Sequence, residues 1–101
     1  MSEQLSTLYA KLLGETASIT WQELQPFFAR GAVLWVEGAQ DLVAMAAGLA
    51  ENDQAQVQRW LQAGVLGKLD DATAADLAER QPSLWAVVVA PWVLVQERAS
   101  A

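Results

Sequence analysis

The chain has 101 residues, of which 53% are hydrophobic and 18% are charged, so we expect one folded domain, residues 1–101, and not a disordered chain. Twelve Asp and Glu against six Lys and Arg give a net charge of -6, which disfavours nucleic acid as a partner because phosphates are also negative. Cys and His are both absent, which removes disulfides, thiol chemistry, and the commonest general base and metal ligand.

The first predicted element is an amphipathic helix over residues 3–13. Its apolar side chains recur with helical spacing: Leu5, Leu8, Tyr9, Leu12 and Leu13. Gly14 is expected to end this helix in a left-handed conformation. The segment has no basic lead and carries Glu3 and Lys11, so it does not predict a signal peptide and we expect a cytoplasmic protein.

A second helix is predicted over residues 21–30. Thr20 and Glu23 have the spacing of a capping box, in which side chain and backbone of the first turn bond reciprocally. Gly31 is placed to close the helix. The apolar run AVLWV, residues 32–36, then predicts a short strand.

Two further helices follow in close succession. Asp41 and Asp53 are suited to cap helices over residues 41–50 and 54–63. The side chains of the second of these helices that we expect to face the core are Val57, Trp60 and Leu61. Gly64 closes that helix, and VLGKL, residues 65–69, predicts a strand.

The last third begins with a short helix predicted over residues 70–80 and ends in the apolar stretch LWAVVVAPWVLV, residues 84–95. As a helix, this stretch would span roughly 18 Å, short of the ~30 Å bilayer core, and Pro91 would break it. Its Val and Trp content favours strand instead. We predict a strand over 84–90, with residues 92–97 as its continuation or as a second strand, and no membrane association.

This order of elements is that of a winged helix preceded by an extra amphipathic helix. We therefore predict an α+β fold with a helix-turn-helix at residues 41–63 and a small antiparallel sheet. Residues 70–83 would form the wing. The short strand between the first two core helices is the feature that favours this fold.

Two stretches also resemble a known family. GETASITWQELQPFFARGAVLWV, residues 14–36, and LWAVVVAPWVLVQER, residues 84–98, are similar to the uncharacterised bacterial family DUF2288, a domain of unknown function. Residues 41–69 agree with it in type and spacing. The resemblance implies a small bacterial protein that stands alone, and it implies no activity, cofactor or catalytic residue.

An interface is the site that the sequence favours most. Neither face of strand 84–90 is polar, and helix 3–13 is expected to cover the face that the core helices leave open. The apolar residues then left without cover are Trp92, Val93, Leu94 and Val95. Trp21, at a helix start, is a further candidate anchor. We expect a homodimer with residues 91–96 or the N-terminal helix at the contact; the alternative is that this segment closes the sheet within one chain.

The function expected from these features is protein–protein interaction with an unknown partner. The alternative is a DNA-binding transcription regulator with helix 54–63 in the major groove. The residues that would face DNA in that reading are Gln58, Arg59, Gln62 and Lys68. Pairs of carboxylates stand at helix starts, where they cap amides. No catalytic residue, metal ligand or cofactor is predicted, and we do not expect an enzyme.

Overall fold

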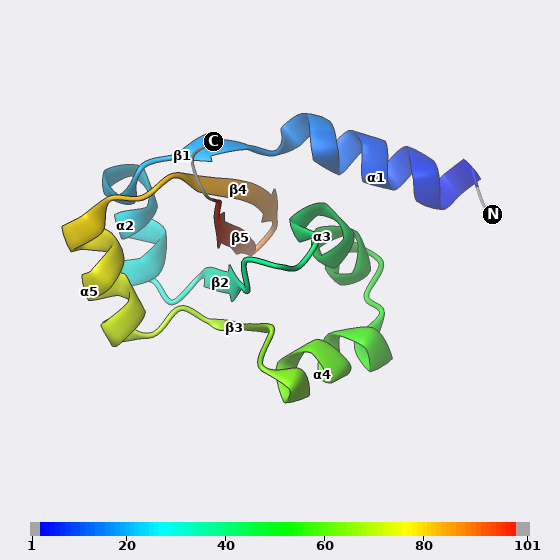
Figure 1. Ribbon diagram of the computed structural model, residues 1–101. Coiled ribbons are helices and arrows are strands. Elements are labelled where there is room, and N and C mark those ends of the chain that lie inside the picture. The colour runs from blue at the N-terminus through cyan, green and yellow to red at the C-terminus, as the bar shows by residue number, and fades with distance from the viewer. Residues whose placement is uncertain (1–2, 99–101) are drawn as a thin grey trace.

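The computed structural model describes the backbone of residues 3–98 and the side chains of residues 7–98. These residues form five helices and five strands (Figure 1). In chain order the elements are α1 (Glu3–Glu15), β1 (Ala17–Ile19), α2 (Trp21–Ala29), β2 (Val33–Val36), α3 (Leu42–Ala50), α4 (Gln54–Ala63), β3 (Leu66–Lys68), α5 (Asp71–Arg80), β4 (Leu84–Val89) and β5 (Trp92–Glu97). None of the helices within residues 3–98 is long and apolar enough to cross a bilayer.

The five strands form one mixed sheet in the order β1-β4-β5-β2-β3. β2 runs parallel to β5, whereas the other neighbouring pairs are antiparallel. β4 and β5 form a hairpin in which Val89 lies opposite Trp92, and the peptide bond between Ala90 and Pro91 in its turn is cis. Residues 92–97 are therefore a separate strand within the sheet of one chain. This is the alternative to a homodimer contact that was predicted from the sequence.

The prediction of a small antiparallel sheet, as in a winged helix, is wrong. In that fold β3 and β4 would pair across the wing, but here β5 and β2 lie between them. The physical reason is the apolar character of β5, which takes the centre of the sheet and hydrogen-bonds to strands on both sides. The helix-turn-helix-like pair α3–α4 does form, with Asn52 in the left-handed conformation in its turn.

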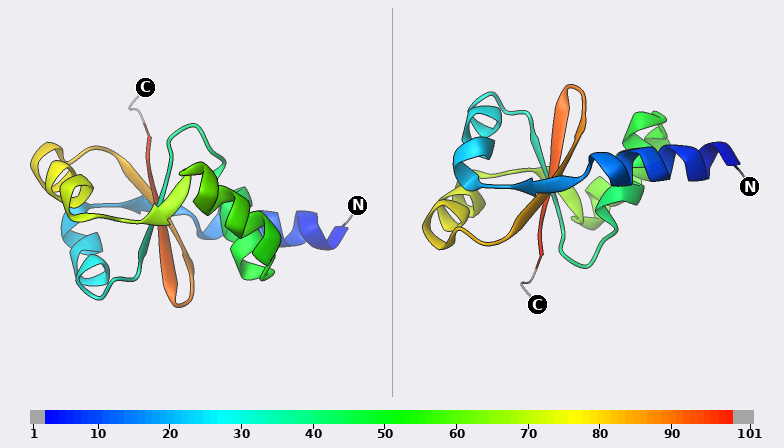
Figure 2. Two further views of the ribbon diagram at one scale, coloured as in Figure 1. Left: turned by 90° about the horizontal axis from the view of Figure 1, so that it is seen from below. Right: turned by 90° about the horizontal axis from the view of Figure 1, so that it is seen from above.

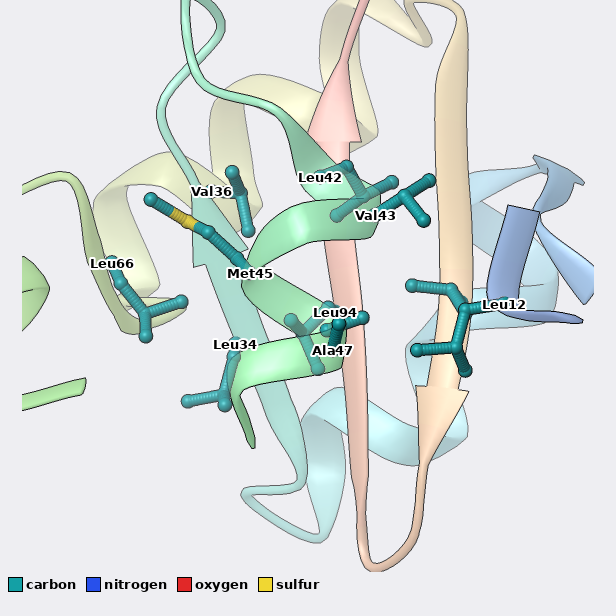
Figure 3. Packing of buried hydrophobic residues seen from close by; sticks show 11 residues of the cluster. Leu12, Leu34, Val36, Leu42, Val43, Met45, Ala47, Leu66 and Leu94 are labelled. Atoms are coloured by element: carbon teal, nitrogen blue, oxygen red, sulfur yellow. The ribbon is translucent and has the colours of Figure 1, made fainter. Parts of the chain in front are cut away.

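Helices cover both faces of the sheet (Figure 2). α1, α3 and α4 pack on one face, where Leu12, Met45 and Leu94 belong to one buried cluster (Figure 3). α2 and α5 cover the other face, with Leu24 and Leu77 in a second cluster. The expectation that α1 would cover the face opposite the core helices is wrong, because α1 packs beside α3. The α+β class is confirmed.

Most of the predicted helix ends are confirmed. The caps are the side chains of Asp41, Asp53 and Asp70, which accept hydrogen bonds from backbone N–H groups of their first turns. Gly64 follows α4 with a φ of 77°, as expected of a left-handed cap. Gly14, in contrast, lies inside α1, which ends one residue later. Just after this end, the hydroxyl of Thr16 donates to the carbonyl of Leu12 at 2.7 Å.

The inward face of α4 differs from the prediction at one position. Val57 and Trp60 are half-buried against the first core cluster, but Leu61 is 43% exposed. α4 lies at the margin of the fold (Figure 1) and contacts α3 and β3. An ideal Cβ at Gly48 would lie 2.7 Å from the Trp60 ring, so the absence of a side chain at Gly48 lets that indole approach α3.

The capping box of α2 gives a direct test of the local assignments. Thr20 N donates to Glu23 Oε1 at 3.0 Å, and Glu23 N donates to Thr20 Oγ1 at 3.1 Å. Replacing Thr20 by Ala removes the second bond and should lower the free energy of unfolding by about 1 kcal/mol in urea melts. Thr20→Ser keeps the hydroxyl and should retain most of that stability. Equal stability of Thr20→Ala and the parent chain would contradict the role of the cap.

Candidate interaction surface

The segment predicted to be an exposed interface lies inside the fold. Val93, Leu94 and Val95 are all buried, and Trp92 is half-buried. β5 has β4 and β2 on its two edges and helices over both faces. The prediction of an interface at residues 92–95 is therefore wrong, because strand pairing and the two helical layers cover these side chains within one chain. They do not form a contact surface of the folded molecule.

Trp21, the other predicted anchor, lies at the surface. It is half-buried at the start of α2, with its ring centroid 5.8 Å from that of Phe28. The side chain lines an open pocket of about 300 Å³ together with Ile19, Pro82 and Trp85. The pocket lies where β1 leads into α2 and where the loop after α5 enters β4. A residue at this position can contact a partner without unfolding of the chain.

The sheet has a stepped edge next to this pocket. β1 pairs only with residues 84–86, the first half of β4. Within residues 3–98, the second half of β4, residues 87–89, pairs with β5 alone. Val88 lies in this second half and is 59% exposed. An apolar side chain is thus presented beside strand backbone that has a neighbour on one side only.

A second pocket, of about 320 Å³, joins Val88 to the first pocket. Its apolar walls include Phe27, Ala86 and Val88. The two pockets share Ser18, Ile19 and Glu23, so they adjoin each other along β1. We call this surface the edge groove and define it by Ser18, Ile19, Trp21, Glu23, Phe27, Pro82, Trp85 and Val88.

Carboxylates stand along the edge groove. Glu15 and Glu23 line the pocket beside Val88, and one oxygen of Glu23 is engaged by the capping box. The guanidinium of Arg30 lies over the Phe27 ring, 4.9 Å from its centroid. The groove therefore combines apolar walls, a short edge strand and two acidic side chains.

The residues that were predicted to face DNA in the alternative function lie on a different part of the surface. Gln58, Arg59 and Gln62 are exposed on α4, and Lys68 is exposed on β3. Lys68 Nζ lies 5.7 Å from the ring centroid of Trp92. Arg30 and Arg98 likewise lie over aromatic rings, and Arg80 is paired with carboxylates. Four of the six cationic side chains thus have partners within the chain. Phosphate binding needs several cations on one face, and these paired cations do not favour it.

The remaining polar clusters are formed by contacts within the chain. Arg80 binds Asp76 at 2.7 Å and Glu97 at 3.0 Å, and these hydrogen bonds hold the pKa of both carboxyls below the usual range. Gln96 is buried, and its amide donates to the backbone carbonyls of Glu37 and Gln40. Among the side chains of residues 7–98, no group of three or more Asp and Glu is placed to hold a metal ion.

The edge groove was not predicted from the sequence, in which residues 15–18, Glu-Thr-Ala-Ser, show no strand pattern. Three residues of β1 are too few for an alternating pattern to emerge. The available signal is Ile19, an apolar residue directly before the cap at Thr20, which packs against the second core cluster.

Comparison with known proteins supplies a family and a structural relative. A family model described as "Protein of unknown function (DUF2288)" matches residues 7–97. The chain is similar to the NMR solution structure of PA1075 from Pseudomonas aeruginosa, with 62% identity and a TM-score of 0.81. That similarity covers 99% of this chain and 93% of the other. Among curated proteins no match is found.

Proposed function

The chain belongs to the DUF2288 family, and for this member we propose a non-catalytic role in which the edge groove binds an extended segment of another protein. One observation carries the proposal: Val88 is 59% exposed on the half of β4 that β1 does not pair with. A strand with one edge left open, beside an exposed apolar side chain, is the usual setting for strand addition.

The groove suits an extended segment better than a helix. A segment laid beside β1 or the end of β4 would find main-chain hydrogen-bonding groups along the sheet edge. Alternate side chains of the segment would point toward the apolar walls formed by Phe27 and Val88. Trp21 and Trp85 would contact the segment beyond β1, and buried indoles are common anchors at interfaces.

The occupant that we propose is a different protein and not a second copy of this chain. Two copies paired edge to edge would each bring Glu15 and Glu23 into the contact, and like charges across a strand pair are destabilising. The net charge of -6 adds a general repulsion between copies. A partner segment with Lys or Arg among apolar residues would complement the groove.

Affinity capture from cells that encode the chain, with mass spectrometry, tests this function. The parent chain should retain a specific protein that Val88→Lys loses, because Lys places a charge against the apolar wall. Ala75→Lys, a matched change at an exposed position on α5, should retain it. Loss of the same protein with both variants, or retention with both, would contradict binding at the edge groove.

A further inference from the structure

A further pocket, separate from the two pockets of the edge groove, lies among α1, α3 and α4. It measures about 290 Å³, and its lining includes Tyr9 and Trp60, the small residues Ala47 and Gly48, and the carboxylates of Glu51 and Asp53. We call it the helix pocket. Tyr9 and Trp60 pack against the first core cluster, whereas Ile19, Trp21 and Phe27 of the edge groove pack against the second. The helix pocket and the edge groove have no lining residue in common, so each surface can be tested separately.

We infer that the helix pocket binds a cationic side chain, lysine or arginine, carried by a partner protein. The walls are aromatic, the rim is acidic, and none of the side chains that line the pocket is a cation. Aromatic faces attract ammonium and guanidinium groups through the ring quadrupole, and carboxylates pair with the same groups.

The carboxylates of the rim retain free acceptor capacity. One oxygen of Asp53 accepts from Gln56 N at 3.2 Å, and its second oxygen has no protein donor among the residues whose side chains the structure describes, 7–98. Within the same residues, no cation pairs with Glu51. Both oxygens of Asp41, by contrast, are engaged, since one accepts from two amides of α3 and the other from the Tyr9 hydroxyl at 2.9 Å. Two carboxylates thus face the pocket with capacity for a ligand.

The aromatic side chains of the pocket are also held in place. Trp60 lies against Gly48, where any side chain would meet its ring. The hydroxyl of Tyr9 donates a hydrogen bond to Asp41 at 2.9 Å, and this bond raises the pKa of that hydroxyl above its ordinary value. Elsewhere the chain places its own cations over aromatic rings three times. Among the described side chains, Trp60 and Tyr9 have no such cation.

Titration of the full ¹⁵N-labelled chain with a hexalysine and a hexaarginine peptide tests this inference by NMR. We expect saturable shifts of the Trp60 indole N–H resonance, and none with a hexaglutamine peptide. The double variant Glu51→Gln/Asp53→Asn removes both rim charges. Asn caps helices as well as Asp does, so the fold should persist, while the affinity should fall about tenfold, as expected for the loss of two exposed charge pairs.

The matched control is Asp71→Asn/Glu79→Gln, which removes two charges from α5 on the other side of the sheet. It should change the affinity less than about twofold if the helix pocket is the binding site. Equal weakening by the two double variants would show that only net charge matters and would overturn the inference. Absence of a shift at the Trp60 indole in the parent chain would overturn it as well.

Discussion

Replacing Val93 by Lys should unfold the protein. Val93 is 4% exposed in the central strand β5 and packs in the cluster beneath α2 and α5. The side chains of this cluster are apolar, so an ammonium group at position 93 would be removed from water among them. Burying an unpaired charge costs several kcal/mol, which is comparable with the whole stability of a small domain, about 5–15 kcal/mol. Far-UV circular dichroism and the dispersion of amide resonances measure the loss of structure.

Val88→Lys is the matched control for this substitution. Val88 and Val93 are partners across the β4–β5 pair, but the side chain of Val88 is 59% exposed. Lys at position 88 keeps its charge in water and should alter the free energy of unfolding by less than about 1 kcal/mol. A cooperative, native-like urea melt for Val93→Lys would contradict the central burial of β5.

Replacing Leu77 by Ala should lower the free energy of unfolding by about 3 kcal/mol. Leu77 is fully buried where α5 packs against the sheet, and truncation of a buried Leu typically costs 2–5 kcal/mol through lost transfer energy and a residual cavity. Urea denaturation followed by tryptophan fluorescence gives the difference, since the two-state analysis suits a domain of this size.

Leu61→Ala makes the same chemical change on α4, where the side chain is 43% exposed. It should cost less than about 1 kcal/mol because little apolar surface is returned to water. The pair therefore measures whether α5 forms part of the core and whether Leu61 lies outside it. Equal costs for the two substitutions would contradict the two-layer packing of helices on the sheet.

Local signals account for what the sequence predicted correctly. The starts of α2, α3, α4 and α5 depend on a side chain that bonds an amide two or three residues later, and these bonds are present in the structure. Gly64 and Gly31 have the positive φ expected after a helix. A cap of this kind requires no information from distant residues, so the sequence alone is sufficient.

Long-range pairing accounts for what the sequence did not predict. The sequence predicted correctly that both faces of β4 are apolar. Which helices cover these two faces, however, depends on the strand order. The parallel pairing of β5 with β2 joins residues about sixty positions apart, and no local pattern encodes it. Once β5 is central, β3 and β4 are separated, α2 and α5 take the second face, and the predicted exposure of Val93 and its neighbours disappears.

The candidate site was predicted only in part for the same reason. Trp21 was singled out from its place at a helix start, and it does line the edge groove. Val88 was not singled out, because it is one of three consecutive valines and nothing in the sequence distinguishes it from its two neighbours. Its exposure arises from the shortness of β1, which leaves the second half of β4 without an outer strand.

Site-specific photo-crosslinking from position 88, in living cells that encode the chain, measures the proposed interaction most directly. A photoreactive residue there should yield a discrete crosslinked species that contains another protein, and the same residue at exposed position 75 on α5 should not. Crosslinks from position 88 only to a second copy of the chain, or no crosslinks beyond those from position 75, would contradict a protein partner at the edge groove.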